Sequence, residues 1–459
     1  CDQRLARGVP PAGRPLTGAR RSIFRGMRYA YAPLLILSLA ASPRLAAQDR
    51  SVTLQEAIQL SERVQPLVVQ ARGNVQTAAA QRRSAWGAFL PSVSAGSSAV
   101  DYFSEGRSSV DPVTGEVTLG NQSNRSVGVG LEASVDLFTG FRRGAELKAA
   151  RSAQDAAGAS LVDARFQQAL ATTNQFFDAL AASQVVRVRE ASVHRAEEQL
   201  KVSIAKLQAG SATRSDTLRS LVTLGAARLA LIQSRTDLTT AEAGLARLIG
   251  ERGRVHAADD SAFYQLVAEV DTAAIRAEAE SRSPRVQEAA ANAAAARANL
   301  RASRSAYWPS LNLSASTDWN GSRTTDYALF NQRQVSLGLR WTLFNGFARE
   351  LAVAQRSADL DLADASAADA QREVDAELTA QLAALDAARA KIDITQTSVA
   401  AGTEDLRVLQ ERYRLGASTI VDVLTSQEAL NQAEVDVVVA RFDYLRAKAR
   451  LEALIGRAL

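Results

Sequence analysis

The chain of 459 residues has very few of the side chains that build disulfides and metal sites. It contains one cysteine, Cys1, and two histidines, His194 and His256. A single chain therefore has no internal disulfide or cysteine-ligated metal site, and histidine-centred triads or metal sites have little material. No glycine-rich phosphate loop and no Ser/His/Asp order stands out. We expect no enzyme activity, no cofactor and no bound metal.

Residues 49–459 also have no large surplus of positive or negative charge. The whole chain has 54 Lys and Arg against 49 Asp and Glu, a formal charge of +5. Residues 1–48 hold eight of these Arg and a single acid, Asp2, which leaves 46 basic and 48 acidic residues in 49–459, a net charge of −2. Without a basic surplus, a nucleic-acid partner is not expected.

The first 48 residues are interpreted as a leader. After Met27 and Arg28 comes an apolar stretch from about 29 to 41, followed by the small residues Ala46 and Ala47. This order is typical of a secretory signal peptide, here 27–48, with cleavage near Ala47 or Gln48. A membrane anchor is the alternative, but the stretch is too short to span ~30 Å of hydrocarbon. No apolar run of 18 residues follows, so entry into a membrane would require β-strands.

The remaining chain contains one unit twice. The prolines at 66 and 91 have the same spacing as those at 284 and 309, which gives an offset of 218. From Leu137-Phe-Thr-Gly-Phe141 and Leu343-Phe-Asn-Gly-Phe347 to the Leu-Ile-Gly phrases at 248 and 454, the copies match without a gap at an offset of 206. We therefore expect a first repeat at 49–250, a linker at 251–272 and a second repeat at 273–456.

Long helices are predicted where proline is absent, in 113–283 and 310–459. Apolar residues recur there every seven positions, the period of coiled-coil packing. We expect long helices at 140–209 and 346–415, return helices at 213–249 and 419–455, and a helix ahead of each β-hairpin. At 1.5 Å per residue, the first long helix would reach about 105 Å. The seven-residue stripes are Ala179, Val186, Val193, Leu200, Leu207; Leu224, Leu231, Leu238, Leu245; Leu378, Leu385, Ile392, Val399, Leu406, Tyr413; and Leu430, Val437, Tyr444, Leu451.

Two β-hairpins, 92–138 and 310–344, are predicted from strict alternation of apolar and polar residues, as in Val127 to Leu137. Their strands of about 10 to 12 residues have the length of tilted transmembrane strands, with one apolar face and one face polar enough to line water. An edge of a soluble β-sandwich is the alternative. Aromatic residues at strand ends would form a membrane girdle; these are Tyr102, Phe103, Phe138, Trp319 and Phe344.

Four strands cannot close a barrel, and an open edge in hydrocarbon leaves unpaired backbone groups. The protomer must therefore oligomerise. Two copies would give eight strands around an interior filled by side chains, whereas three would give twelve strands around a water channel.

Several phrases together carry a family resemblance. They are Val52-Thr-Leu-Gln-Glu-Ala-Ile58, the paired Phe89-Leu-Pro-Ser92 and Tyr307-Trp-Pro-Ser310, the paired Leu-Phe-x-Gly, and Tyr413-Arg-Leu-Gly-Ala-Ser-Thr-Ile-Val-Asp-Val-Leu424. In this order, over 49–456, the chain resembles the TolC family of outer-membrane efflux proteins.

The resemblance implies a mainly α fold with transmembrane β-structure. Long coiled-coil helices would form an α-barrel through the periplasm, and four strands per protomer would contribute to a twelve-stranded barrel of a homotrimer in the outer membrane, in contact with lipid. The partners would be a periplasmic adaptor and an inner-membrane transporter of RND or ABC type. The channel would passively conduct substrates in efflux or type I secretion. The resemblance does not say whether the substrate is a drug, a metal or a protein.

The turns between long and return helices hold the candidate functional residues. Gly210 and Gly416 would let each helix end, and Thr213 with Asp216, like Thr419 with Asp422, has the spacing of a capping box. N-capping is therefore one role of both acids.

The resemblance adds a second role, in which Asp422, and Asp216 with it, line a constricted periplasmic entrance. Three Asp422 carboxylates meeting on a threefold axis would resist full ionisation and attract cations. The resemblance also implies hydrogen bonds that close the tip by joining Tyr413 to the Asp216 region; plain packing in the apolar stripe is the alternative for Tyr413. Ser418 and Thr425 stand where some members carry Arg and a second Asp.

A function of a different class stays open at this point. A soluble periplasmic coiled-coil scaffold, such as a pump adaptor, would need the long helices but no strands that face lipid.

Overall fold

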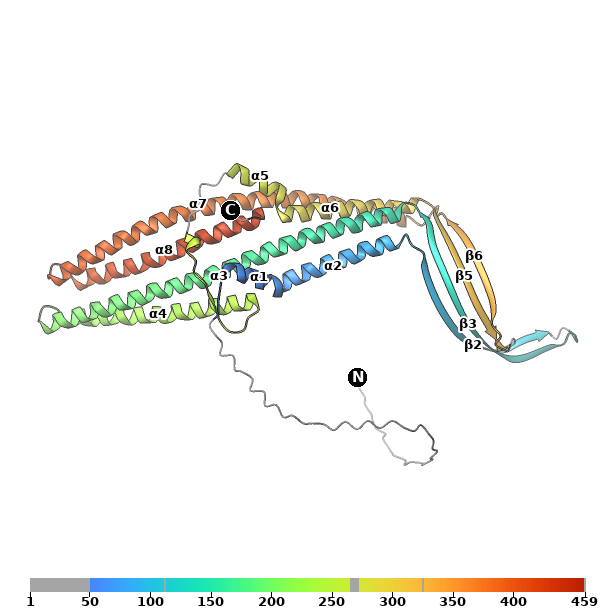
Figure 1. Ribbon diagram of the computed structural model, residues 1–459, viewed down its shortest axis with the longest axis horizontal. Coiled ribbons are helices and arrows are strands. Elements are labelled where there is room, and N and C mark those ends of the chain that lie inside the picture. Colours follow the sequence, from blue (N-terminus) through green and yellow to red (C-terminus); the bar gives the residue numbers. More distant parts are fainter. Residues whose placement is uncertain (1–49, 111–112, 265–271, 324–325, 458–459) are drawn as a thin grey trace, which may run out of the picture. The chain divides into compact units, whose positions relative to one another are not determined.

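The computed structural model describes residues 50–110, 113–264, 272–323 and 326–457 (Figure 1). The predicted leader at 1–48, with Cys1 and Met27, lies outside the described residues. The chain from 49 onward is one compact unit. None of its described helices is long and apolar enough to cross a bilayer.

Proline divides the helix that precedes each hairpin. Helices α1 (Leu54–Val64) and α2 (Pro66–Gly87) are separated at Pro66, and α5 (Thr272–Arg282) and α6 (Pro284–Ser303) at Pro284. Each proline occupies the first turn of the second helix, where its missing N–H costs no hydrogen bond. The two breaks therefore sit at equivalent places in the two repeats.

Four long helices follow the two hairpins. Helices α3 (Arg142–Gln208) and α7 (Ala348–Arg414) each have 67 residues, and their return helices α4 (Arg214–Ile249) and α8 (Ile420–Ile455) each have 36. The seven-residue stripe of α7 is buried at five of six positions, all except the half-buried Val399. In α3 the stripe becomes exposed at its end, where Leu207 is 36% accessible.

The two hairpins join in one four-stranded antiparallel sheet of order β2-β3-β5-β6. Strands β2 (Ser92–Val110) and β3 (Val117–Thr139) have 19 and 23 residues, whereas β5 (Ser310–Ser322) and β6 (Phe330–Arg340) have 13 and 11. The predicted length of about 10 to 12 residues is therefore wrong for the first hairpin. Its outer part, from Asp101 with Arg125 onward, is a two-stranded ribbon that β5 does not reach.

The predicted end of the second hairpin is also displaced. Strand β6 stops at Arg340, so Trp341, Leu343 and Phe344 lie beyond it. The alternation of apolar residues through 343 suggested a longer strand, but the ladder between β5 and β6 ends with Ser310 opposite Arg340. The strand has no partner residues beyond that point.

A short parallel sheet lies in and around the predicted linker. Strand β4 (Val255–Ala257) pairs with β1 (Arg50–Val52), and a 3-10 helix, η1 (Ser261–Tyr264), follows. The main apolar core lies where these segments meet α1 and α3 to α8. Its centre includes Phe176, Phe177 and Phe442, with ring centroids 6.1 Å apart for each consecutive pair. The linker is thus packed against the helices.

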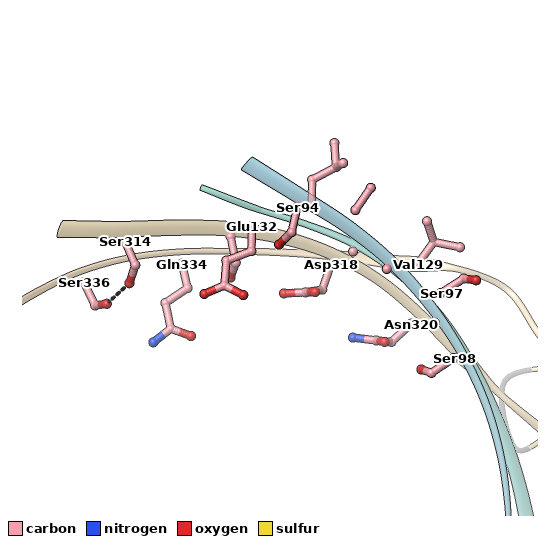
Figure 2. A pocket seen from close by; sticks show the side chains of 16 residues that line it. Ser94, Ser97, Ser98, Val129, Glu132, Ser314, Asp318, Asn320, Gln334 and Ser336 are labelled. Atoms are coloured by element: carbon pink, nitrogen blue, oxygen red, sulfur yellow. Dashed lines mark hydrogen bonds between the residues drawn. The ribbon is translucent and has the colours of Figure 1, made fainter. Parts of the chain in front are cut away.

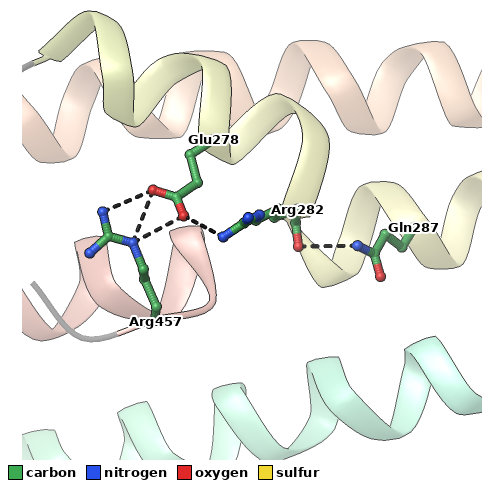
Figure 3. Close-up of polar contacts among 4 residues, drawn as sticks. All are labelled: Glu278, Arg282, Gln287 and Arg457. Atoms are coloured by element: carbon green, nitrogen blue, oxygen red, sulfur yellow. Dashed lines mark hydrogen bonds and ion pairs between the residues drawn. The ribbon is translucent and has the colours of Figure 1, made fainter.

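Helix α5 is tied to the last turn of the chain by charge (Figure 3). The Arg457 guanidinium donates to both carboxylate oxygens of Glu278, from Nε at 3.0 and 2.9 Å. Arg282, one turn along α5, donates to the same carboxylate at 3.0 Å. The hydrogen bond from Arg457 holds the pKa of Glu278 below its usual value. This contact joins the start of the second repeat to its end.

Candidate functional site

The tips of the helical hairpins have the same backbone turn and the same type of cap in the two repeats. Gly210 and Gly416 have φ of 73° and 80°, the left-handed region in which glycine lacks the Cβ penalty. The Thr213 N–H donates to Asp216 Oδ2 at 2.8 Å and the Asp216 N–H donates back to Thr213 Oγ1 at 3.2 Å. The predicted capping boxes of α4 and α8 are both confirmed.

The second box carries one more bond. Asp422 Oδ2 accepts from the Thr419 N–H at 2.9 Å and from the Thr419 hydroxyl at 2.8 Å. These bonds stabilise the charged carboxylate, so they lower the pKa of Asp422. The carboxylate is therefore ionised and exposed at the tip, as a site for cations would need.

Tyr413 is buried, with 6% of its surface accessible, in a small apolar cluster of the α7–α8 tip. The Lys206 ammonium of α3 lies 4.6 Å from its ring centroid, so the side chain bridges the two helical hairpins. Ser203 lies beside the Tyr413 hydroxyl, but the hydroxyl makes no hydrogen bond of good geometry to any residue that the structure describes. The cluster consists of Leu406, Tyr413, Ile420, Val423 and Leu430.

The protomer does not form the expected hydrogen bond between Tyr413 and Asp216 among its described residues, and a bond in the closed assembly stays a prediction. The Asp216 carboxylate accepts from Thr213, and the Ser203 hydroxyl beside Tyr413 already bonds Gln199 O at 3.0 Å and the Ser220 hydroxyl at 2.8 Å. Burial raises the pKa of the Tyr413 hydroxyl, and the charge of Asp216 adds to that effect. Packing and the Lys206 contact hold Tyr413 in place instead.

A second contact between the hairpins was not predicted. Arg195 of α3 donates to Glu434 Oε1 at 3.1 Å and Oε2 at 2.5 Å, and to Asn431 Oδ1 at 2.8 Å, both on α8. Arg195 and Glu434 are only 22% and 23% exposed. Because the two residues are 239 positions apart in the sequence, no local pattern could have indicated this pair.

A groove of about 850 Å³ lies between α4 and α8 at the tips. Its walls are largely apolar, and its α4 side presents Leu218 and Val222, which are 51% and 72% exposed. Side chains of this size rarely stay in water without a partner when they gather in one groove. The α3–α4 tip thus offers an apolar surface beside the charged caps.

The sheet has one polar face across all four strands (Figure 2). Glu132 is opposite Ser94 on one side and Ser316 on the other, and Asp318 is opposite Gly130 and Gln332. Figure 2 shows Glu132, Asp318, Asn320 and Gln334 pointing to the same side of the sheet, where the hydroxyls of Ser314 and Ser336 are 2.7 Å apart. The face carries hydroxyl, amide and carboxylate groups, as a water-filled lumen needs.

The opposite face is apolar and exposed. Val93, Ala133, Ala315 and Val335 are aligned across the sheet, and Val135, Leu313 and Leu337 form the next row. Val93 and Val335 are 72% and 75% exposed. A sheet with one polar and one apolar solvent-exposed face is suited to a boundary between water and lipid.

The predicted aromatic residues are not all at strand ends. Phe138 is near the end of β3, Trp319 near the end of β5, and Phe344 follows β6, but Tyr102 and Phe103 lie inside β2. Because successive residues on a strand point to opposite faces, Tyr102 and Phe103 cannot share one girdle. They mark the level at which the four-stranded sheet becomes a ribbon.

Further aromatic residues collect where the sheet meets the helices. Phe141 contacts Phe138 and Trp308, with centroids 5.3 and 5.9 Å apart, and Phe344 lies 5.5 Å from Phe347. Phe141 and Phe347 have φ of 69° and 64° at the turn from sheet to helix, and their side chains are 69% and 70% exposed. The repeated Gly-Phe phrase could have indicated them.

An arginine supports this turn in each repeat. Arg143 lies 4.9 Å from the Phe89 ring centroid and donates to the carbonyls of Ala88 and Leu137. Its counterpart Arg349 lies 4.9 Å from the Tyr307 ring and donates to the carbonyls of Thr342 and Leu343. Two arginines at offset 206 therefore support the same turn, each against an aromatic ring and backbone carbonyls, although only Arg143 also bonds the segment that follows α2.

Comparison with known proteins agrees with this architecture. Residues 54–251 and 275–457 match the family described as outer membrane efflux protein. The outer membrane efflux protein BepC of Brucella suis is 26% identical over 71% of this chain and 72% of its own, and the protein CyaE of Bordetella pertussis is 27% identical over 82% and 78%.

Solved structures share the fold. The outer membrane protein VceC of Vibrio cholerae aligns with a TM-score of 0.73 at 17% identity, over 88% of this chain and 96% of its own. The fold is thus that of outer-membrane channels, mainly α with transmembrane β-structure, and neither it nor the relatives point to an enzyme. Since the family model covers both repeats almost completely, the chain belongs to the outer membrane efflux protein family and is a protein of the outer membrane.

Proposed function

We propose that this protein is a trimeric exit duct that passively conducts substrates from a gated periplasmic entrance to the exterior. The observation that carries the proposal is the four-stranded sheet with one polar and one exposed apolar face, joined to helices of 67 residues. Such a sheet needs lipid on one side and water on the other. A soluble scaffold or pump adaptor would leave the apolar face without a use.

The trimer is supported by the open edges of the sheet. Strands β2 and β6 are its outermost strands, and their unpaired backbone groups would cost several kcal/mol each in hydrocarbon. Pairing β6 of one protomer with β2 of the next would satisfy both edges. Three copies give twelve strands, which leave room for water, whereas eight would be filled by side chains.

The aromatic residues around the base of the sheet would mark the periplasmic boundary of the membrane. Phe138 and Phe344 of the predicted girdle lie there, together with Phe141, Phe347 and Trp308. Aromatic rings are enriched at the level of lipid headgroups. Trp319 would lie nearer the outer boundary.

The entrance is proposed at the tips, with Asp422 as its main charged group and Asp216 beside it. The pKa of Asp422 is lowered by its cap, so one carboxylate per protomer is charged at neutral pH. Three of them around an axis would attract cations. Tyr413, Gly416, Thr419, Gly210 and Thr213 would form the gate and its turns.

Block of the conductance by multivalent cations in planar bilayers tests the entrance. Asp422→Ala should weaken the block at least several-fold, whereas Thr419→Ala, which loosens the same cap but keeps the carboxylate, should preserve most of it. Equal block of all three proteins would remove Asp422 from the entrance.

Opening would require the tip helices to move apart, as a bistable packing element does. Tyr413 beside Lys206, and Arg195 with Glu434, would hold the resting state. An engineered cross-link that restrains residues 413–424 should stop export. Export that continued at the normal rate would contradict this gate.

The partners would be a periplasmic adaptor and an inner-membrane transporter of RND or ABC type. The apolar groove between α4 and α8 supports an adaptor contact at the tip. The transporter would choose the substrate, since nothing on the polar face of the sheet is specific for one chemical class. Cross-linking in cells followed by copurification would identify both partners.

A further inference from the structure

A groove of about 560 Å³ opens where the sheet meets the helices. Its apolar wall is formed by Phe89, Phe138 and Phe141, and its other wall by Arg143, Lys148 and Arg301. All come from one protomer. Phe138 is opposite Leu311 in the ladder, and Leu311 is opposite Leu339, so the groove continues the apolar face of the sheet.

The charges of this groove are not balanced by acids. None of its ten lining residues is Asp or Glu. Lys148 and Arg301 are exposed and have no ion-pair or hydrogen-bond partner among the described residues. Arg143 bonds only to the carbonyls of Ala88 and Leu137, which leave its charge intact. Three cations therefore face one small apolar groove.

The order of these groups along the molecule matches the polarity of a lipid. The aromatic rings are at the sheet end, which belongs in the membrane. Lys148 lies six residues beyond the first residue of α3, roughly 9 Å along the helix. Arg301 occupies the last turn of α6. An acyl chain at the rings would place its headgroup at the two cations, at the level of the membrane interface.

The second repeat has lost this pattern. At offset 206, Glu350 stands in place of Gly144 and Ala354 in place of Lys148. The Glu350 carboxylate accepts from the Tyr307 hydroxyl at 3.5 Å and lies 3.9 Å from Arg349. An acid at that place would repel an anionic headgroup. The two junctions therefore have the same backbone turn, but the second lacks the surplus of positive charge, because Glu350 lies beside Arg349 and an alanine replaces the lysine.

We propose that the groove of the first repeat binds an anionic phospholipid of the surrounding membrane, with its phosphate between Lys148 and Arg301 and an acyl chain against Phe138 and Phe141. The proposal rests on the location in the outer membrane and does not depend on conduction or gating.

Native mass spectrometry of the full-length, delipidated protein tests it, with phosphatidylglycerol and phosphatidylcholine of identical acyl chains as probes. The protein should bind phosphatidylglycerol more tightly. Lys148→Gln with Arg301→Gln should lower that affinity roughly thirtyfold, since each cation near an anionic surface contributes about fivefold. Phosphatidylcholine, whose phosphate is balanced by its own choline cation, should lose much less affinity.

A second variant copies the other repeat into the groove. Gly144→Glu with Lys148→Ala should also abolish the preference, and the glutamate is sterically tolerated, since a Cβ at Gly144 meets nothing within 4 Å. Arg165→Gln is the control, because Arg165 is exposed on the same helix, about 25 Å farther from the sheet. It should behave as the unmodified protein, and circular dichroism should show unchanged helix content for all three.

Two results would overturn the proposal. One is equal affinity of the protein and both groove variants for phosphatidylglycerol. The other is displacement of phosphatidylglycerol by inorganic phosphate at millimolar concentration, which would make the groove a site for free anions. Bilayer conductance is measured separately. A failure of lipid binding therefore does not contradict the proposed exit duct, and a failure of conductance does not contradict the lipid site.

Discussion

The two helical hairpins have the same backbone but different chemistry at their tips. Both have helices of 67 and 36 residues, a left-handed glycine and a capping box. The α7–α8 tip closes around the apolar cluster of Tyr413. At the equivalent level the α3–α4 tip buries two serine hydroxyls, Ser203 and Ser220, and leaves Leu218 and Val222 exposed.

This difference indicates a division of roles after duplication. The residues that set the backbone, the glycines and the threonine-aspartate caps, are the same in both copies. The residues on either side of them have changed: Val222 corresponds to Glu428, and Leu207 to Tyr413. We infer that the α3–α4 tip serves mainly as the surface for a partner, and that the α7–α8 tip serves mainly as the gate.

The largest effect is expected from charging the partner surface. Leu218→Asp combined with Val222→Asp should reduce cross-linking of the adaptor by more than tenfold and stop export, because a buried carboxylate without a partner costs several kcal/mol. The conductance of the purified channel should not change. Thr239→Asp, exposed on the same helix outside the groove, is the control. A change in conductance with normal adaptor binding would reverse the assignment of the two tips.

Truncating Tyr413 should have the next largest effect. Tyr413→Ala should lower the local stability of the tip by about 3 kcal/mol, as for other buried aromatic residues. The equivalent Leu207→Ala should cost less than about 1 kcal/mol, since that side chain is 36% exposed. Hydrogen exchange of the two tips measures both. Tyr413→Phe should cause little loss, because the hydroxyl has no hydrogen-bond partner within the described part of the protomer; a large loss would mean that the hydroxyl is bonded in the assembled protein.

The sequence predicts the parts of the molecule that local rules determine. Duplication gives the repeats, a seven-residue period gives the long helices, and Thr-x-x-Asp gives the caps, all within a few residues of their observed positions. The outer parts of β2 and β3 could not be predicted, because apolar and polar residues do not alternate in 101–125. The backbone of a two-stranded ribbon pairs without such alternation.

Contacts between the repeats were beyond such rules. Two such contacts depend on how α3 lies against α7 and α8. They are the contact of Lys206 with the Tyr413 ring and the hydrogen bonds of Arg195 to Glu434 and Asn431. No spacing along the chain encodes that arrangement. The expected bond from Tyr413 to the Asp216 region depends on the same arrangement and stays a prediction; in the protomer, Asp216 Oδ2 accepts from Thr213.

A smaller and symmetric effect is expected at the caps. Thr213→Ala and Thr419→Ala should each lower the stability of the first turn of α4 or α8 by about 1 kcal/mol. Hydrogen exchange of amides 214–217 and 420–423 reports the two losses. Only Thr419→Ala should also alter the open probability of the channel in bilayers. If Thr213→Ala altered it equally, the gate would not be confined to the second hairpin.

The smallest effect is the pH dependence of the α8 cap, and its sign is the most informative. The cap lowers the pKa of Asp422 from an ordinary value of 3.8. The carboxylate therefore stabilises the folded tip fully above about that pH, and this contribution is lost as the pH falls through the lowered pKa. Protection of amides 420–423, corrected for intrinsic exchange, should fall only below pH 3.8, and Asp422→Asn should remove the dependence.

Assembly would act in the opposite direction. Three Asp422 carboxylates close to one axis repel one another, which raises their pKa values. If repulsion raises these pKa values above the ordinary 3.8, protonation relieves it, so protection in the assembled protein would rise rather than fall as the pH is lowered through the raised pKa. The sign of the change decides which role of Asp422 dominates. A loss confined to lower pH in the assembled protein would leave Asp422 a capping residue like Asp216, and the α7–α8 tip would differ from its copy by apolar packing alone.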